Sequence, residues 1–147
     1  MSYNLLKGKK GIIFGALDDK SIAWKVAEKA HDEGAVFTLS NTPTAQRFGM
    51  LNELAEKTNS EIILADATSV PDLTNVFNKS MEILDGKVDF VLHSIGMSLN
   101  VRKKRVYNDL DYNFLNKTLD ISAVSFQSLP FNPEGDFHLI LFLTIKE

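Results

Sequence analysis

The sequence predicts an α/β protein built on a doubly wound parallel sheet. Short apolar runs without polar alternation recur along the chain, a segment with helical periodicity follows each of them, and the links are short. Strands of this kind are typical of parallel sheets, because helices bury both faces of the sheet. We therefore expect one domain with helices on both sides of a central sheet.

The first half of this pattern is the clearest. Residues 11–14 are expected to form a buried strand, and residues 21–33 carry apolar side chains at helical spacing opposite a charged face. Gly34 stands where a residue in the left-handed conformation commonly ends a helix. A second strand is then expected over residues 35–40.

The rest of the chain continues the alternation of strands and helices. The expected elements are a helix from Pro43 to about residue 57, a strand at 61–65, a helix opened by Ser69 and Pro71, a strand at 88–94, and a helix over about 111–127 after an irregular polar stretch. No internal repeat or interdomain linker is visible in this order.

Composition excludes several classes of function. The chain has 147 residues, a hydrophobic content of 44% and a net charge of −3, which gives no general attraction to nucleic acid or anionic membranes. No apolar run approaches the roughly 20 residues of a membrane span, and the first residues do not form a secretory signal. Because cysteine is absent, disulfides and thiolate metal sites are excluded. We expect a cytoplasmic protein with no nucleic-acid or membrane partner.

The candidate site lies at the carboxyl ends of the strands, where open α/β sheets bind ligands. Gly15 ends the first apolar run, and Ser21 and Ile22 open the following helix. Such a turn can aim backbone N–H groups at a phosphate. The full G-x-G-x-x-G pattern is absent, so a glycine turn that only connects strand to helix accounts for this segment equally well.

The second and third strand ends carry polar residues. Thr42 follows the second strand, but no acidic residue stands there to bind ribose hydroxyls, so the choice between NAD and NADP is not readable by that rule. Arg47 fits either a ribose phosphate or a solvated helix face. Asp66, followed by Ala67, could accept a hydrogen bond from an adenine amino group, or it could serve only as a turn residue.

The fourth strand end consists of Ser94, Ile95 and Gly96, whose small side chains allow a flat ring to lie against the backbone. His93 is interpreted as a packed strand residue rather than a catalytic base. Asp18 and Asp19 lack further residues with ligand spacing, so no metal site is expected.

A run of four basic residues, Arg-Lys-Lys-Arg, occupies positions 102–105 in an expected loop. It could meet an acidic carrier protein or a phosphate, but such runs are more often solvated loop charge, which is the interpretation favoured here.

Taken together, the strand ends resemble a known family. The residues that carry the resemblance are Gly15-Ala16-Leu17 leading into Ser21-Ile22-Ala23-Trp24, then Asp66-Ala67, then His93-Ser94-Ile95-Gly96, with Asp120-Ile121-Ser122 and Ser125-Phe126 in the last helix. Over about residues 5–128 the chain is similar to the bacterial enoyl-acyl-carrier-protein reductases, divergent members of the short-chain dehydrogenase/reductase superfamily.

This resemblance implies a Rossmann-like doubly wound sheet and a reductase of fatty-acid biosynthesis. NADH, or alternatively NADPH, would reduce the double bond of a trans-2-enoyl thioester carried by acyl carrier protein, and the family forms tetramers, so a homo-oligomer is expected. The implied positions are Gly15, Ser21 and Ile22 at the pyrophosphate, Thr42 near the adenosine ribose, Asp66 and Ala67 at adenine, Ser94, Ile95 and Gly96 along the cofactor, Ile121 near the nicotinamide, and Ser98 near the acyl substrate.

The chain departs from the family in its last part. The Tyr-x6-Tyr-x6-Lys spacing of the family's catalytic pair is not found, and Tyr107 and Tyr112 stand too early, so no catalytic residue is assigned. Residues 1–128 are expected to form a partial reductase domain that ends after about the fourth or fifth strand. Residues 129–147 form a divergent tail, whose apolar run at 137–145 is either a fifth strand or unrelated sequence.

Such a chain by itself is expected to be a weak or inactive reductase. A non-catalytic nucleotide-binding or interaction module, or a gene fragment, remains the alternative.

Overall fold

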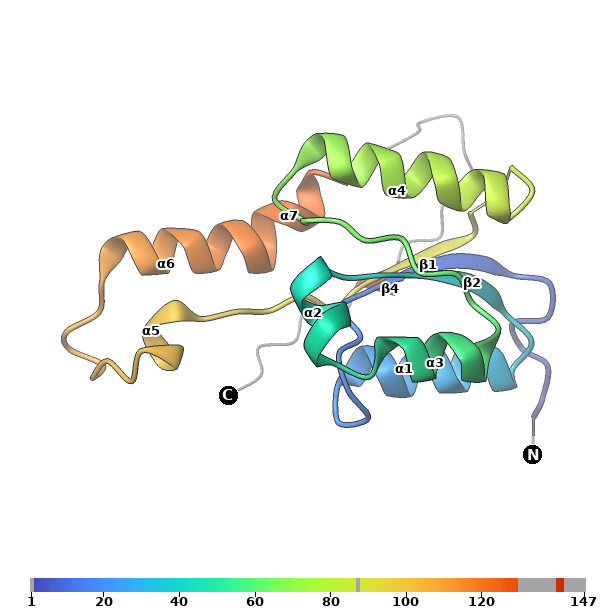
Figure 1. The fold of residues 1–147 in the computed structure, drawn as a ribbon, viewed down its shortest axis with the longest axis horizontal. Coiled ribbons are helices and arrows are strands. Elements are labelled where there is room, and N and C mark those ends of the chain that lie inside the picture. The colour runs from blue at the N-terminus through green and yellow to red at the C-terminus, as the bar shows by residue number, and fades with distance from the viewer. Residues whose placement is uncertain (1, 87, 130–139, 142–147) are drawn as a thin grey trace.

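The structure, a computed structural model, describes residues 2–86, 88–129 and 140–141. Its centre is a parallel sheet with helices on both faces (Figure 1). The strands lie in the order β2-β1-β3-β4. Their bounds are Lys10–Phe14 for β1, Val36–Ser40 for β2, Phe90–His93 for β3 and Ile140–Leu141 for β4. This arrangement confirms the predicted fold class.

The pairing register aligns the carboxyl ends of β1, β2 and β3 with one another. Phe14, the last residue of β1, pairs with Ser40 of β2 on one side and with His93 of β3 on the other. Because all pairings are parallel, the loops that leave these strands share one edge of the sheet.

The segment expected to be a strand, residues 61–65, lies beside β2 but does not form a regular strand. It makes one isolated parallel bridge, between Ile62 and Leu39, supported by hydrogen bonds from Leu39 N to Glu61 O and from Ile63 N to Leu39 O. The segment lies at the outer side of β2, on the side away from β1, and this bridge is its one pairing assigned in the described part of the chain. The spatial order is therefore third, second, first and fourth expected strand, as in doubly wound dinucleotide folds.

Helices α1, Ile22–Asp32, and α3, Leu51–Thr58, cover one face of the sheet, and α4, Val70–Ile83, covers the other (Figure 1). Alternate strand residues serve the two layers. Ile13, Leu39 and Leu92 pack with α1 and α3, whereas Ile12, Phe14 and Val91 pack with α4. The apolar strands noted in the sequence are thus buried on both sides.

The expected single helix from Pro43 to about residue 57 is wrong. The chain forms α2, Pro43–Phe48, and α3, with a break at Gly49 and Met50. Met50 N donates to Leu17 O at 2.8 Å, and a Cβ on Gly49 would stand 2.6 Å from the same Leu17 oxygen. The break lets the loop after β1 pack on this turn, a tertiary contact that helical periodicity does not encode.

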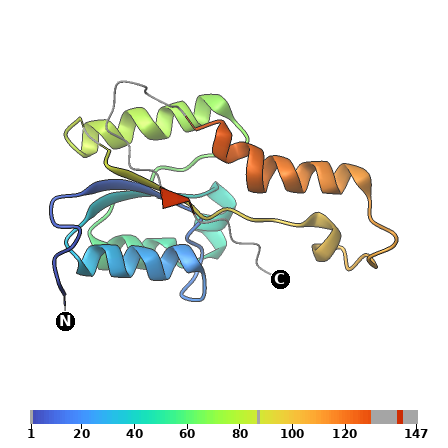
Figure 2. The same ribbon diagram turned by 180° about the vertical axis from the view of Figure 1, so that it is seen from behind.

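The last described helices extend beyond the sheet (Figures 1 and 2). The stretch expected to be irregular contains the short helix α5, Leu99–Arg102. The expected helix at 111–127 is present as α6, Tyr112–Leu119, the π-helical turn η1, Asp120–Val124, and α7, Ser125–Gln127. π-turns occur often at functional sites.

Two residues of the apolar run at 137–145 form the short strand β4. Ile140 pairs with Leu92 and Leu141 with His93, both parallel, while residues 137–139 and 142–145 of the apolar run lie outside the described residues. No helix in the described ranges is long and apolar enough to cross a membrane.

Candidate functional site

The first and fourth strand ends meet at Gly15. Its backbone N donates to Ser40 O at 3.1 Å, and Ser94 N donates to Phe14 O at 3.3 Å. Gly15 has φ +93, and a Cβ built there would overlap the carbonyl oxygen of Ser94 and lie 2.7 Å from its carbonyl carbon. The contact falls between β1 and β3, where the strand order reverses, and such switch points are where doubly wound folds bind ligands.

The loop from Gly15 to α1 is closed by the hydroxyl of Ser21. Ser21 Oγ accepts from Leu17 N at 3.2 Å and donates to Asp18 O at 2.8 Å. It makes no side-chain cap to α1, and the first turn of α1 carries no acidic residue. The positive end of the helix dipole is therefore not neutralised by a side chain of that turn, and Ile22 is 45% exposed there.

The second strand end is tied to the first by Asn41. Its Nδ2 donates to Ala16 O at 2.8 Å, and its Oδ1 accepts from Thr42 N at 2.8 Å. Thr42 Oγ1 accepts from Ala45 N and caps α2. The backbone oxygen of Asn41 accepts from Ala65 N at 3.0 Å, which joins the third end to the second. Sequence reasoning missed this linking role, although an asparagine in a tight turn is its usual signal.

The third strand end places Asp66 on the surface. Asp66 Oδ1 accepts from the backbone N of Thr68 at 2.9 Å and from its hydroxyl at 2.7 Å. These two hydrogen bonds hold the pKa of Asp66 below its ordinary value, so the carboxylate stays ionised and able to accept hydrogen bonds. Asp66 thus acts as a turn residue, while Ala67 beside it is buried.

The fourth strand end continues through Ile95 and Gly96 to a contact with η1. Met97 N donates to Ser122 Oγ at 3.1 Å, and Ser122 Oγ lies 3.4 Å from Met97 O. Ser122 follows Ile121 directly, so this contact brings the implied nicotinamide-side residue to the loop. Ser98 accepts from Val101 N at 3.4 Å and caps α5.

His93 is a packing residue, as predicted. It is fully buried, its Nε2 lies 2.9 Å from Ser125 Oγ, and the Phe126 ring packs edge-on against it. Because Ser125 Oγ donates to Ile121 O at 2.7 Å, it accepts from His93, which places the proton on Nε2. Burial lowers the pKa of His93 and keeps the ring neutral. The positioning roles of Ser122 and Ser125 were not found from the sequence.

The four strand ends therefore form one connected edge, which we call the strand-end site. Its links are Asn41 to Ala16, Ala65 to Asn41, Gly15 to Ser94, and Met97 to Ser122. Within the described ranges no three His, Asp or Glu residues could hold a metal ion together.

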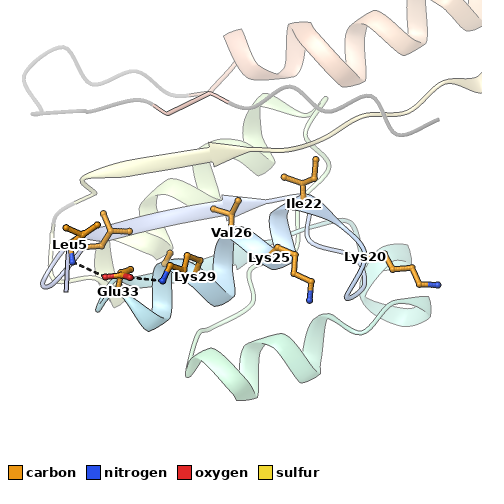
Figure 3. A pocket seen from close by; sticks show the side chains of 9 residues that line it. Leu5, Lys20, Ile22, Lys25, Val26, Lys29 and Glu33 are labelled. Carbon is orange, nitrogen blue, oxygen red and sulfur yellow. Dashed lines mark hydrogen bonds and ion pairs between the residues drawn. The ribbon is translucent and has the colours of Figure 1, made fainter. Parts of the chain in front are cut away.

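A groove of about 550 Å³ lies elsewhere, along the outer side of α1 (Figure 3). Ile22 and Val26 line it together with Leu5, and lysines 20, 25 and 29 stand around it. It runs toward Glu33 at the far end of α1, and it shares Ile22 with the start of α1 at the strand-end site. Its apolar lining does not resemble a phosphate site.

The fold is that of a Rossmann-type α/β domain, and the strand-end site occupies the position where this class binds ligands. Residues 15–130 match the family model described as "Enoyl-(Acyl carrier protein) reductase". The chain belongs to this family.

Individual relatives agree with this result. The chain is 32% identical over 128 residues to enoyl-[acyl-carrier-protein] reductase [NADH] 2 of Rhizobium meliloti, a match that covers 85% of this chain and 46% of the relative. It is 63% identical to the protein in the crystal structure of the FabI–NADH complex from Alistipes finegoldii, with a TM-score of 0.83, and the match covers 86% of this chain and 44% of that one.

A third similar structure, the Bacillus cereus enoyl-acyl carrier protein reductase with NADP+ and indole naphthyridinone, is 26% identical with a TM-score of 0.75, over 88% of this chain and 50% of that one. The chain spans about half the length of the relatives it matches.

Proposed function

We propose that this chain binds NADH or NADPH at the strand-end site and provides the cofactor-binding half of an enoyl-acyl-carrier-protein reductase. The observation that carries the proposal is the contact of Gly15 with the Ser94 carbonyl beside the start of α1. Because glycine has no side chain, only backbone atoms of this residue occupy the switch point of the sheet. NADH and NADP+ are named in the descriptions of two similar structures.

In this proposal the residues predicted from the sequence act along one extended ligand. Asp66 and Ala67 contact the adenine, Thr42 lies near the adenosine ribose, and the cofactor continues toward the nicotinamide. Gly15, Ser21 and Ile22 hold the pyrophosphate, Ser94, Ile95 and Gly96 flank the cofactor, and Ile121 lies at the nicotinamide end. The ionised carboxylate of Asp66 suits an adenine amino donor, and the α1 terminus suits a diphosphate.

The cofactor, when bound, supplies a hydride to the β-carbon of the enoyl thioester. The chain's own residues bind and orient it, and Ser98 lies near the acyl group. No catalytic residue is assigned, because the Tyr-x6-Tyr-x6-Lys spacing does not occur in this sequence. The substrate is a trans-2-enoyl group on acyl carrier protein, with a homo-oligomer in the cytoplasm as the working form.

Titration of the chain with NADH, followed by nicotinamide fluorescence, tests the binding site. We expect saturable binding, and Asp66→Asn should weaken it several-fold because a neutral amide oxygen accepts from the adenine amino group less strongly than an ionised carboxylate does. The same variant should leave the affinity for reduced nicotinamide mononucleotide unchanged, since that ligand has no adenine.

Asp85→Asn is the matched control, because Asp85 Oδ2 belongs to an exposed side chain with one long ion pair, 4.0 Å from Lys10. Absence of NADH binding to the folded chain would refute the proposal. Equal weakening of both ligands by Asp66→Asn would refute the adenine assignment.

A non-catalytic nucleotide-binding module is the second candidate, favoured because the Tyr-x6-Tyr-x6-Lys spacing does not occur among these 147 residues. Oxidation of NADH in the presence of a crotonyl thioester tests the module, because robust turnover would rule it out and support a reductase whose catalytic groups lie within these residues. Binding without turnover is expected both of the module and of a partial reductase.

A further inference from the structure

A projecting arm continues directly from the strand-end site. It consists of α5, α6 and the loop between them, residues 99–119, and it extends beyond the edge of the sheet (Figures 1 and 2). Ser98 caps its first helix, so the arm begins where the acyl substrate is proposed to lie. A molecule that contacts the arm would therefore stand next to the substrate end of the site.

The arm is held in shape by the side chain of Asn100, which is 5% exposed. Its Nδ2 donates to Asp111 O at 3.2 Å, and its Oδ1 accepts from Asp111 N at 2.9 Å. Within the loop, Arg105 donates to the backbone oxygen of Asp109 at 2.7 Å and pairs with its carboxylate at 3.0 Å. These contacts give the loop a defined surface.

That surface carries cations in excess. Arg102, Lys103 and Lys104 are exposed and take part in no ion pair within the described part of the chain. Arg105 is the member of the run that has a carboxylate partner. The cluster stands on a chain whose net charge is −3, so it is a local feature and not the result of a basic composition.

Lys104 occupies a backbone position that favours glycine. It has φ +53, and the bonds from Lys104 N to Val101 O and from Arg105 N to Asn100 O form the 5→2 and 6→1 pair of a Schellman motif. Glycine is usual at this position because a Cβ disfavours the left-handed conformation. A lysine here places a cation directly after α5, against the local backbone preference.

Exposed apolar side chains precede and follow the cations along the chain. Val101 is 61% exposed, Val106 63% and Tyr107 92%. Tyrosine and arginine beside apolar groups are enriched in protein interfaces, whereas lysines in polar surroundings are typical of solvated surface.

We propose that this basic arm docks the acidic face of the acyl carrier protein that presents the enoyl thioester. The inference rests on the proposed function, because the family's substrate is carrier-bound. Complementary charge accelerates encounter and orients the partner, and docking on the arm brings the tethered acyl group to the Ser98 end of the site.

Anisotropy titrations of the full chain with fluorescently labelled crotonyl-acyl carrier protein test the proposal. We expect binding that weakens at least tenfold between 50 and 300 mM salt, roughly the sensitivity of an interface with several charge contacts. The double reversal Arg102→Glu/Lys103→Glu should weaken binding at low salt by at least tenfold as well.

The matched control is Lys7→Glu/Lys79→Glu, which makes the same change of net charge at exposed positions away from the arm and should change affinity less than twofold. Failure of the unmodified chain to bind the carrier at low salt, or equal effects of the two double reversals, would overturn the proposal. Tighter binding of an RNA oligomer than of the carrier would overturn the choice of partner.

Lys104→Gly separates docking from folding. It should raise the melting temperature, since glycine relieves the left-handed backbone, and yet weaken carrier binding several-fold. A higher melting temperature with unchanged carrier affinity would refute the role of Lys104. Affinity for NADH is measured on every variant and should be unchanged, so that failure of the nucleotide site is recognised independently of failure of the docking surface.

Discussion

The backbone of Gly15 lies against the carbonyl group of Ser94, 79 residues further along the chain. Gly15 follows β1 and Ser94 follows β3, and the two strands pair in parallel from Gly11 with Phe90 to Phe14 with His93. Gly15 has φ +93, and the Ser94 carbonyl occupies the space that a Cβ would need. Glycine alone among residue types satisfies both the backbone conformation and the close contact. The contact defines the strand-end site.

Replacement of Gly15 by alanine should therefore damage both stability and nucleotide binding. The left-handed backbone costs about 1–2 kcal/mol for alanine, and forced separation from Ser94 adds about 1–3 kcal/mol. The control is Gly8→Ala, because Gly8 has φ +75 with nothing within 4 Å of a Cβ and should lose the first amount only. Urea unfolding measures stability and NADH titration measures binding; equal losses in both variants would contradict the steric role of the Ser94 contact.

The hydroxyls of Thr38 and Ser80 form a buried hydrogen bond of 2.7 Å that joins β2 to α4. Thr38→Val leaves Ser80 buried without this partner and should destabilise the fold by about 1–3 kcal/mol. Thr38→Val/Ser80→Ala removes both polar groups and should cost less than the sum of the single changes. Chemical denaturation of the four proteins of this cycle measures the coupling, and additive losses would show that the bond does not stabilise the fold.

Ser125 holds His93 through the 2.9 Å contact to Nε2. Ser125→Ala should destabilise the protein by about 1–3 kcal/mol, because it leaves a buried N–H donor unsatisfied. Ser128→Ala is the control, since that hydroxyl also bonds a helix carbonyl, Val124 O, but is exposed. Thermal unfolding compares the two variants, and a similar small effect of both would contradict a buried His93–Ser125 bond.

Glu33 anchors the N-terminal segment to the end of α1. Its carboxylate accepts from Tyr3 N at 2.9 Å, Leu5 N at 3.2 Å and Lys29 Nζ at 2.7 Å. The Lys29 bond is the main cause that lowers the pKa of Glu33 from 4.5 to about 2. Because the folded-state pKa is depressed, the anchoring is complete above pH 4.5 and is lost as the pH falls toward about 2.

Hydrogen exchange at the amides of Tyr3 and Leu5 should therefore accelerate, relative to unstructured peptides, as the pH falls through this window. Glu33→Gln should show weak protection of these amides at every pH. Protection that persists unchanged down to pH 2 would contradict the anchoring role of the carboxylate.

Local pattern predicted most of the architecture. The apolar strands, the α1 helix with its Gly34 end, and the Ser69 cap of α4 are all recognisable from short-range signals, and Ser69 does accept from Asp72 N. The break at Gly49 was not predictable in this way, because it depends on the contact of Met50 N with Leu17 O.

The same division applies to the candidate site. The residue types at the strand ends are visible in the sequence because small and polar residues interrupt apolar runs. The links made by Asn41, Ser122 and Ser125 depend on partners distant in sequence, such as Ser122 with Met97, and periodicity contains no information about them.

By itself, the sequence determined the parallel α/β class, the family resemblance and the residues that leave each strand, because hydrophobic spacing and turn chemistry act over a few neighbouring residues. Only the tertiary structure decided that Gly15 packs on Ser94, that residues 61–65 make a single bridge, and that the basic run stands on a projecting arm. These outcomes depend on contacts between residues far apart in the sequence. Such contacts form only when the sheet and its helices are packed together.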